Sequence, residues 1–595
     1  MDHCPHQLLA TLPAASRRDR AASTAYASIV VQSNTNTGAQ SDAINRRTFL
    51  RKSAGVAVAA GALGTITGCL SHFVAAAEHD IIIRGGLVYD GNGNDPVEVD
   101  VGIRGSRIIS IGNMAGRSAG RVLDATGMMV CPGFVDIHGH SDLTILQDGQ
   151  AESKIRQGVT TEIIGQDGRS LAPLSRQMQR GFKAYLENSL GIRMDWYDFQ
   201  GYYNAILREG ISINIRSMIG AGTLRENIMG YDRRKMESYE INSVQSLIRL
   251  ATEQGARHLS SGLEYLPGSH AGTAELTALA RTAGLYSTHM RNEDDAVLPA
   301  LQEALTIADR AQAALNISHI KAQGNRNYDK LPTMLSMLDR ARGWNRQVTC
   351  DRYPYLAYNT GLANLFPLDV REDGTTRFIQ HLRDPDYYDR LRSDVEYKVA
   401  SLGSYHGILI AESASSKYAR FEGRRLDEVA RILRKNPYDV LVDMIISSGG
   451  SSTMIGFGMD EQNLHRLLRY DHCAIASDGA ALNANWKHAA AHPRSFGTFP
   501  RVLGKYVREK RVLSMPAAIR KMTALPADIV GLEKRGRIQL NHYADITIFD
   551  PGRIRDRATY DNPRRYPQGI EYVLVNGQVV IDRGEHTGAR PGTIV

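Results

Sequence analysis

Short apolar segments alternate with longer helical segments through the middle of this 595-residue chain. Residues 286–289 and 315–319 are apolar and strand-like, and they are followed by residues 292–313 and 332–342, which have helical patterning. Such an alternation favours βαβ units and a parallel sheet with helices outside it. The chain has room for a TIM (β/α)8-type barrel of about 250 to 400 residues and a smaller domain. We therefore predict the α/β class.

The two ends of the chain beyond its first 79 residues show a different pattern, in which short β-type segments are separated by turn residues. At the C-terminal end, residues 571–575 precede Asn576-Gly577, a pair that strongly favours a hairpin turn. These patterns predict that residues 80–132 and 536–595 combine into one small β-sandwich domain.

The predicted barrel, residues 133–535, contains a segment that is longer than one βα unit needs. This segment, residues 363–469, is rich in Arg, Asp and Tyr. Long loops inserted into compact domains often act as active-site lids. We expect an insertion over the barrel mouth, either as a lid or as a structural excursion without a catalytic duty.

Residues 1–79 carry the features of an export signal. Arg46-Arg47 precedes an apolar run, residues 54–67, which is too short and too weakly hydrophobic to be a good membrane-spanning helix. This order is typical of a twin-arginine signal. Cys69 ends a stretch that resembles a lipoprotein processing box, where cleavage would leave a lipid-anchored cysteine, and residues 75–77 offer an alternative cleavage site. We expect a periplasmic protein or a membrane-anchored lipoprotein; a cytosolic protein with a fortuitous arginine pair is the alternative.

The net charge of +8 does not indicate a nucleic-acid partner. Residues 1–77 contain seven Arg or Lys and three Asp, so the presequence accounts for half of the excess. The other positive charges are scattered, without the basic stripe that phosphate binding requires. The five cysteines include no Cys-x-x-Cys pair, so neither a disulfide framework nor a thiolate zinc site is predicted.

The strongest local signal is the segment Pro132–Asp142, in which an apolar strand ends in His138 and His140. Side chains two residues apart on a strand point to the same face, so both imidazoles are expected to enter the barrel together. Active sites of such barrels lie at the C-terminal ends of the strands, and imidazole is a common ligand of zinc-like metals. One such pair alone is weak support for a metal.

Two further histidines stand at the ends of strand-like segments. His289 ends the segment that begins at Leu285, and His319 ends the segment that begins at Leu315. A single histidine at such a place is more often structural, but four histidines at successive strand ends are difficult to explain as core residues. Together they predict a metal site at the barrel mouth.

Asp478 follows the apolar residues Ile475-Ala476 near the end of the predicted barrel. A carboxylate beside a metal can accept a proton from water and later deliver it to a leaving amine. The alternative for Asp478 is a cap on the following helix.

In this order, the histidines and Asp478 resemble the amidohydrolase superfamily, and more closely the D-aminoacylase (N-acyl-D-amino-acid deacylase) family. The resemblance covers about residues 80–595 and implies a metal-dependent barrel that hydrolyses an amide bond. The shared motifs include Gly158–Thr161, Gly262–Gly268, Thr288–Glu293, Ser318–Lys321, Asp351–Tyr355 and His492–Arg494.

The resemblance implies a cofactor of one or two divalent ions, with zinc as the expected metal. His138 and His140 would hold one ion, and His289 and His319 would hold the other with a bridging ligand.

The bridging ligand is where this sequence departs from the family. Its members carry Asn-Cys-Gly at the place where this chain has Gln166-Asp167-Gly168, so Asp167 stands where a thiolate would be. A carboxylate can also bridge metals, although it favours harder ions. Glu162 is the alternative ligand.

Asp478 matches the general acid/base of the family. A cationic side chain at the substrate positions would suit the free α-carboxylate that every N-acyl amino acid carries. A surface ion pair is the alternative for Arg494. The residues matched to substrate-binding positions are Lys321, Tyr355 and Arg494, with Tyr265 and Arg291 as further candidates.

The expected reaction is deacylation of an N-acyl-D-amino acid to a carboxylate and a D-amino acid. Two alternatives within the superfamily are cleavage of dipeptides and of cyclic amides. The alternative from another class is a catalytically inactive exported binding protein, but a binding protein has no need of Asp478 beside four histidines.

Overall fold

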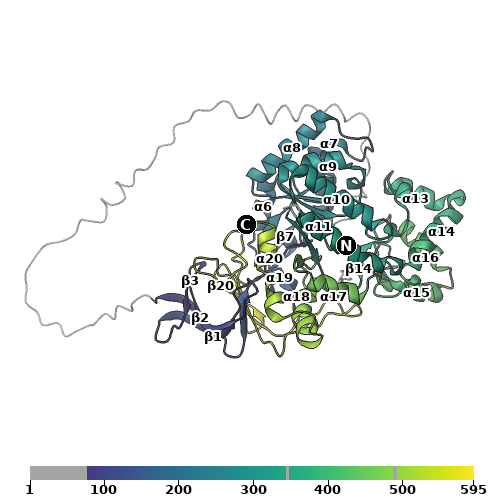
Figure 1. Ribbon diagram of the computed structural model, residues 1–595. Helices are drawn as coiled ribbons and strands as arrows, with labels where there is room; N and C mark the ends of the chain where they lie inside the picture. Colours follow the sequence, from purple (N-terminus) through teal and green to yellow (C-terminus); the bar gives the residue numbers. More distant parts are fainter. Residues whose placement is uncertain (1–76, 344–346, 487–491) are drawn as a thin grey trace, which may run out of the picture. The chain divides into compact units, whose positions relative to one another are not determined.

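The computed structural model describes residues 77–343, 347–486 and 492–595 (Figure 1). The predicted twin-arginine segment and Cys69 lie outside these residues.

A parallel β-barrel forms the centre of the described chain. Its strands follow one another in sequence order, and β8 and β9 are separated only by Met218. The last strand meets the first because the Asp478 amide donates to the His138 carbonyl (2.8 Å) and the His140 amide donates to the Gly479 carbonyl (3.0 Å). The strands are β6 (Phe134–Asp136), β7 (Val159–Ile164), β8 (Asn214–Ser217) with β9 (Ile219–Gly220), β10 (Leu259–Gly262), β11 (Leu285–His289), β12 (Ala314–Ile317), β13 (Val348–Arg352) and β17 (Cys473–Ile475).

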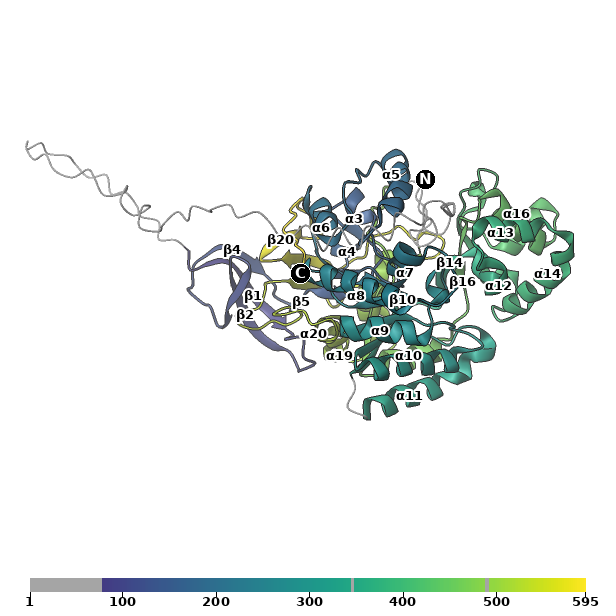
Figure 2. The ribbon, with the colours of Figure 1, turned by 90° about the horizontal axis from the view of Figure 1, so that it is seen from above.

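Helices cover the outside of this barrel. In α10, the buried residues Val297, Leu301, Ala304 and Ala308 recur at helical spacing, so one apolar stripe faces the sheet. Figure 2 shows α8, α9, α10 and α11 side by side along the barrel. Among the described residues, no helix is long and apolar enough to cross a membrane. The covering helices include α7 (Ala221–Met229), α8 (Ser238–Glu253), α9 (Thr273–Ala283), α10 (Val297–Ala311), α11 (Leu331–Gly343), α17 (Glu461–Arg469), α18 (Arg494–Arg501), α19 (Met515–Met522) and α20 (Ala524–Ile529).

A second sheet combines both ends of the described chain. Its central pair is antiparallel, with Met129 opposite Phe549 and Pro132 opposite Ile546. The two segments lie together in Figure 1 as purple and yellow strands. The predicted fold class, a barrel with a small β domain built from both chain ends, is confirmed. The strands are β1 (His79–Val88), β2 (Val97–Arg104), β3 (Arg107–Gly112), β4 (Ala119–Asp124), β5 (Met129–Pro132), β18 (Ile546–Phe549), β19 (Ile570–Val575), β20 (Gln578–Asp582) and β21 (Glu585–His586).

The segment after β13 forms a separate lobe with its own apolar core. Leu391, Ile410, Leu441 and Met444 are all buried within this core. A three-stranded sheet joins the lobe to the barrel mouth, since its strand β14 begins only six residues after β13. The elements of the lobe are β14 (Tyr358–Gly361), β15 (Ile408–Glu412), β16 (Thr453–Gly456), α12 (Leu368–Arg371), α13 (Thr375–Arg383), α14 (Pro385–Ala400), α15 (Leu426–Leu433) and α16 (Pro437–Ser447).

Candidate metal centre

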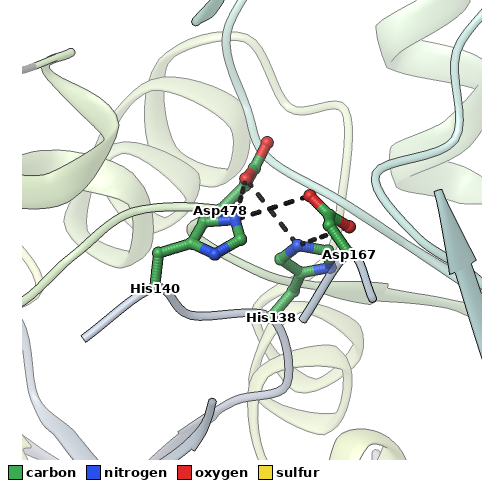
Figure 3. A group of neighbouring side chains, drawn as sticks. All are labelled: His138, His140, Asp167 and Asp478. Atoms are coloured by element: carbon green, nitrogen blue, oxygen red, sulfur yellow. Dashed lines mark hydrogen bonds and ion pairs between the residues drawn. The ribbon is translucent and has the colours of Figure 1, made fainter. Parts of the chain in front are cut away.

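The first two histidines follow β6 and are turned into the barrel together. Both His138 and His140 are buried. The residue between them has to be glycine, because a Cβ on Gly139 would collide with the Glu162 carboxylate. The spacing of two residues therefore places both imidazoles on one side of the chain, as Figure 3 shows.

Two carboxylates complete a first group of possible ligands with this pair (Figure 3). The His140 Nε2 atom lies 2.9 Å from Asp478 Oδ1, and the His138 Nε2 atom lies 3.5 Å from Asp167 Oδ1. Asp167 follows the end of β7 in a left-handed conformation (φ 52°), which aspartate tolerates better than most residues. This group is His138, His140, Asp167 and Asp478, and its ligand atoms lie within 4.8 Å of one another.

A second group shares Asp167 with the first. His289 ends β11, and His319 follows β12, so both side chains reach the same barrel mouth. The His319 Nε2 atom lies 3.5 Å from Asp167 Oδ1, and the His289 Nδ1 atom lies 3.9 Å from Asp167 Oδ2. The Asp167 carboxylate therefore lies between the two groups, with Oδ1 near His138 and His319 and Oδ2 near His140 and His289.

These side chains fit a divalent metal. Both ring nitrogens of His138 and the Oδ1 atom of Asp167 are buried without a hydrogen bond in the described structure. Buried polar atoms are nearly always satisfied, so a cluster of such atoms indicates a missing partner. Imidazole nitrogens and carboxylate oxygens are the donors that zinc and similar ions accept.

The electrostatic field of the site keeps its carboxylates ionised. Burial raises the pKa of Asp478, but the Arg494 guanidinium and the neighbouring imidazoles outweigh burial and hold this pKa well below its usual value. Burial raises the pKa of Asp167 as well, but His138 and His319 outweigh burial and hold this pKa well below its usual value. Both aspartates can therefore act as anionic ligands or bases at neutral pH.

A cavity opens directly onto the two groups. Tyr265, Lys321 and Arg494 line it, and Arg494 Nη1 lies 2.7 Å from Asp478 Oδ2. The lobe after β13 supplies part of the wall. Its lining residues include Tyr358, Asn359, Thr360, Asn364, Lys398 and Met454.

Two of the residues predicted to bind substrate lie outside the cavity lining of the described structure. Tyr355 is buried, and its hydroxyl donates to the Pro493 carbonyl (3.2 Å) outside the described cavity lining. Tyr353 lines the cavity instead, and it lies just after the end of β13 at Arg352, where the extended strand no longer fixes side-chain directions. Arg291 also lies outside that lining, since its guanidinium is bound to Glu303 and to two backbone carbonyls.

Glu162, the alternative metal ligand, is held by other partners. It accepts hydrogen bonds from the Ser141 hydroxyl and lies 3.1 Å from the Lys154 ammonium. It belongs to neither ligand group that contains Asp167.

Sequence reasoning also missed two carboxylates of the cavity. Glu264 lies 3.3 Å from His289 Nε2, and Glu293 lies 3.1 Å from His319 Nδ1. Both belong to motifs that carry the family resemblance, which is the signal that could have identified them. Their pairing with particular histidines depends on loops from different strands, so it could not be inferred from spacing.

A closed parallel barrel whose strand ends turn four imidazoles and two carboxylates towards shared points defines a class of metal-dependent barrel enzymes. The model of the amidohydrolase family matches residues 121–365 and 465–581. The chain belongs to this family. The interval between the two matched segments coincides with the inserted lobe.

Several relatives resemble the chain over most of its length. N-acyl-D-glutamate deacylase of Alcaligenes xylosoxydans xylosoxydans is 34% identical over 87% of this chain and 96% of its own. The N-acyl-D-glutamate deacylase of Bordetella bronchiseptica, solved with zinc and a phosphonate mimic of the tetrahedral intermediate, is 32% identical, covers 87% of this chain and 99% of its own, and has a TM-score of 0.74. A D-aminoacylase studied for its binuclear metal centre gives 32% identity, the same coverage and a TM-score of 0.72. The predicted resemblance to the D-aminoacylase family is confirmed.

Proposed function

We propose that this protein is a metal-dependent hydrolase of linear amide bonds that converts N-acyl-D-amino acids to a carboxylate and a D-amino acid. One observation carries the proposal: two ligand groups share Asp167 at the base of a cavity, and Asp478 and Arg494 lie beside them. The relatives named above act on N-acyl-D-amino acids, and one was solved with zinc.

The metal would be one or two zinc-like ions. His138 and His140 would hold one ion, His289 and His319 would hold the other, and Asp167 would contact both. Such an ion, when bound, supplies Lewis-acid activation of water and of the scissile carbonyl.

Asp478 is the group that moves the proton. As an ionised carboxylate beside His140, it can accept a proton from the attacking water on its free oxygen lone pairs. The protonated carboxyl can then pass the same proton to the departing nitrogen. The Arg494 guanidinium keeps the carboxylate oriented during both transfers.

The free carboxylate of the substrate would bind to cations that line the cavity. Lys321 and Arg494 are among these cations, and Tyr353 belongs to the same lining. The charge of arginine persists at every physiological pH, so Arg494 favours an anionic substrate under all working conditions.

We propose further that the chain is exported by the twin-arginine route and is anchored through a lipid on Cys69 or released into the periplasm. Arg46-Arg47 and the apolar run after it support export, and the sequence around Cys69 supports the anchor. Arg46→Lys with Arg47→Lys should leave the protein in the cytoplasm. Cys69→Ala should move it from the membrane fraction to the soluble periplasmic fraction if the anchor exists.

A paired substrate panel tests the reaction. The zinc-loaded protein is assayed on N-acyl-D-amino acids, their L-enantiomers, dipeptides and cyclic amides, with product amines measured directly. We expect release of free D-amino acids, loss of this activity after chelation and its return with zinc. Hydrolysis of only the dipeptides or cyclic amides would replace the proposed substrate, and no hydrolysis by fully metal-loaded protein would refute the proposal.

A further inference from the structure

The outer nitrogens of the second histidine pair face two carboxylates, which belong to neither ligand group containing Asp167 but form a third possible ligand group with His289. His289 Nε2 lies 3.3 Å from Glu264 Oε2 and 3.8 Å from Glu293 Oε2. His319 Nδ1 lies 3.1 Å from Glu293 Oε1. Glu293 thus reaches both histidines, and its side chain is only 4% exposed, against 23% for Glu264.

This arrangement bears on which ring nitrogen carries the proton. A neutral imidazole has a proton on one nitrogen and a lone pair on the other, and only the lone pair can bind a metal. The inner atoms, His289 Nδ1 and His319 Nε2, lie 3.1 Å apart beside Asp167. A metal there requires protons on the outer nitrogens, and these protons need acceptors.

Lys321 competes for one of these outer nitrogens. Its ammonium lies 2.9 Å from His319 Nδ1 and could donate a hydrogen bond to that atom. In that tautomer the proton would sit on Nε2, which would then be unable to bind a metal. Glu293 opposes this, because both of its carboxylate oxygens bind the same ammonium (Oε1 at 2.7 Å and Oε2 at 2.6 Å) and Oε1 can also accept from the imidazole.

We propose that Glu293 and Glu264 are positioning residues that select the metal-binding tautomers of His319 and His289. Outer carboxylates of this kind orient ligating imidazoles and strengthen their metal affinity by about 10- to 100-fold. Glu293 also holds Lys321, so the same carboxylate joins the second metal position to the cation that would bind the substrate. The inference rests on the metal centre of the proposed function.

The test measures zinc affinity directly, by competition with a chromophoric chelator, in the full-length protein. The wild type should bind two zinc ions. Glu293→Gln should weaken one of the two affinities by 10- to 100-fold and leave the other within about threefold. Glu264→Gln should weaken the same affinity by less, because Glu264 contacts only one histidine and is partly exposed to water.

A matched control is Glu303→Gln. Glu303 is a partly buried carboxylate that is bound to a basic side chain, as Glu293 is, but it contacts Arg291 and Thr273 and belongs to no ligand group of the described residues. Both zinc affinities should be unchanged in this variant. A merely structural role of Glu293 would lower both affinities and the unfolding temperature together, which would contradict the proposal.

The zinc measurements distinguish a failure of the proposed function from a failure of the tautomer proposal. Wild-type protein that binds no zinc would refute the metal-dependent function itself. If Glu293→Gln and Glu264→Gln bind two ions as tightly as the wild type does, only the tautomer proposal is overturned. If Glu293→Gln does not fold, Glu264→Gln decides the question, because unchanged affinities in that variant overturn it as well.

Discussion

The two histidine pairs of the centre are held in different ways. His138 and His140 follow a single strand end. Backbone hydrogen bonds to the residues after β17 and a buried cation behind the strand end keep this segment in place. His289 and His319 come from two strands, and the outer nitrogens of their rings face carboxylates. The position of the first pair depends on the closure of the barrel and on a buried ion cluster behind it, and that of the second on carboxylates beside its own rings.

The buried cation behind the first pair is Lys154. Its ammonium donates to Asp136 (2.6 Å), to the Ser477 hydroxyl (2.8 Å) and to the Gly479 carbonyl (2.8 Å), and the side chain is fully buried. It therefore ties the end of β6 to the residues on both sides of Asp478. This metal centre therefore combines strand ends held by backbone hydrogen bonds with side chains held by neighbouring charged groups.

Asp478→Asn should have the largest effect on activity, because Asp478 lies beside His140 of the first pair and moves the proton in the proposed reaction. We expect kcat to fall about a thousandfold with the fold and bound zinc retained, as general acid–base catalysis typically contributes this much. Steady-state kinetics and metal analysis of the same preparation measure both quantities. Retained turnover would refute the role given to Asp478.

Lys154→Met should lower the stability of the protein, because Lys154 holds the strand end that carries the first histidine pair. The change leaves the Asp136 and Glu162 carboxylates buried without their cation, and breaking a buried ion pair costs about 3 kcal/mol. Denaturant unfolding measures the loss. The control is Lys183→Met, whose partner Glu187 is exposed, and which should change the free energy of unfolding by at most about 0.5 kcal/mol. Equal stability of both variants would show that the Lys154 cluster does not hold the strand end.

Asp167→Ala should separate the two pairs by their metal affinity. The first group keeps three other possible ligands, whereas the second keeps only its two histidines. Zinc titration should show the second affinity reduced by about 100-fold, at least as much as loss of an outer-shell partner, and the first affinity reduced less. Asp294→Ala, a buried aspartate outside both groups, is the control. Equal losses at both positions would contradict the shared-ligand arrangement.

The smallest expected effect concerns two tyrosines that lie two residues apart. Tyr353→Phe removes a hydroxyl from a residue of the cavity lining and should lower kcat/KM by about three- to tenfold, the effect of one hydrogen bond. Tyr355→Phe removes a bond to the Pro493 carbonyl and should cost about 1 kcal/mol of stability with kcat/KM unchanged. Kinetics and thermal unfolding of both variants test this assignment, and the reverse pattern would restore the sequence prediction.

Local patterns were sufficient for the fold and for the four histidines. The alternation of strands and helices, the β-type segments at both ends and the histidine spacing at β6 are properties of neighbouring residues, and covalent geometry translates them directly into structure. Asp478 could be located in the same way, because it follows a strand of the barrel, whereas Asp167 was located only through the family resemblance.

The remaining parts of the site were decided by tertiary structure. Tyr353 and Tyr355 differ in sequence by two positions, and only the turn after β13 determines which one faces the cavity. Glu162 has the chemistry of a ligand, but Lys154 and Ser141 hold it elsewhere. Glu264 and Glu293 meet their histidines only after loops from different strands fold together. Pattern and spacing act over a few residues, whereas the ionisation and direction of a buried side chain depend on all the groups packed around it.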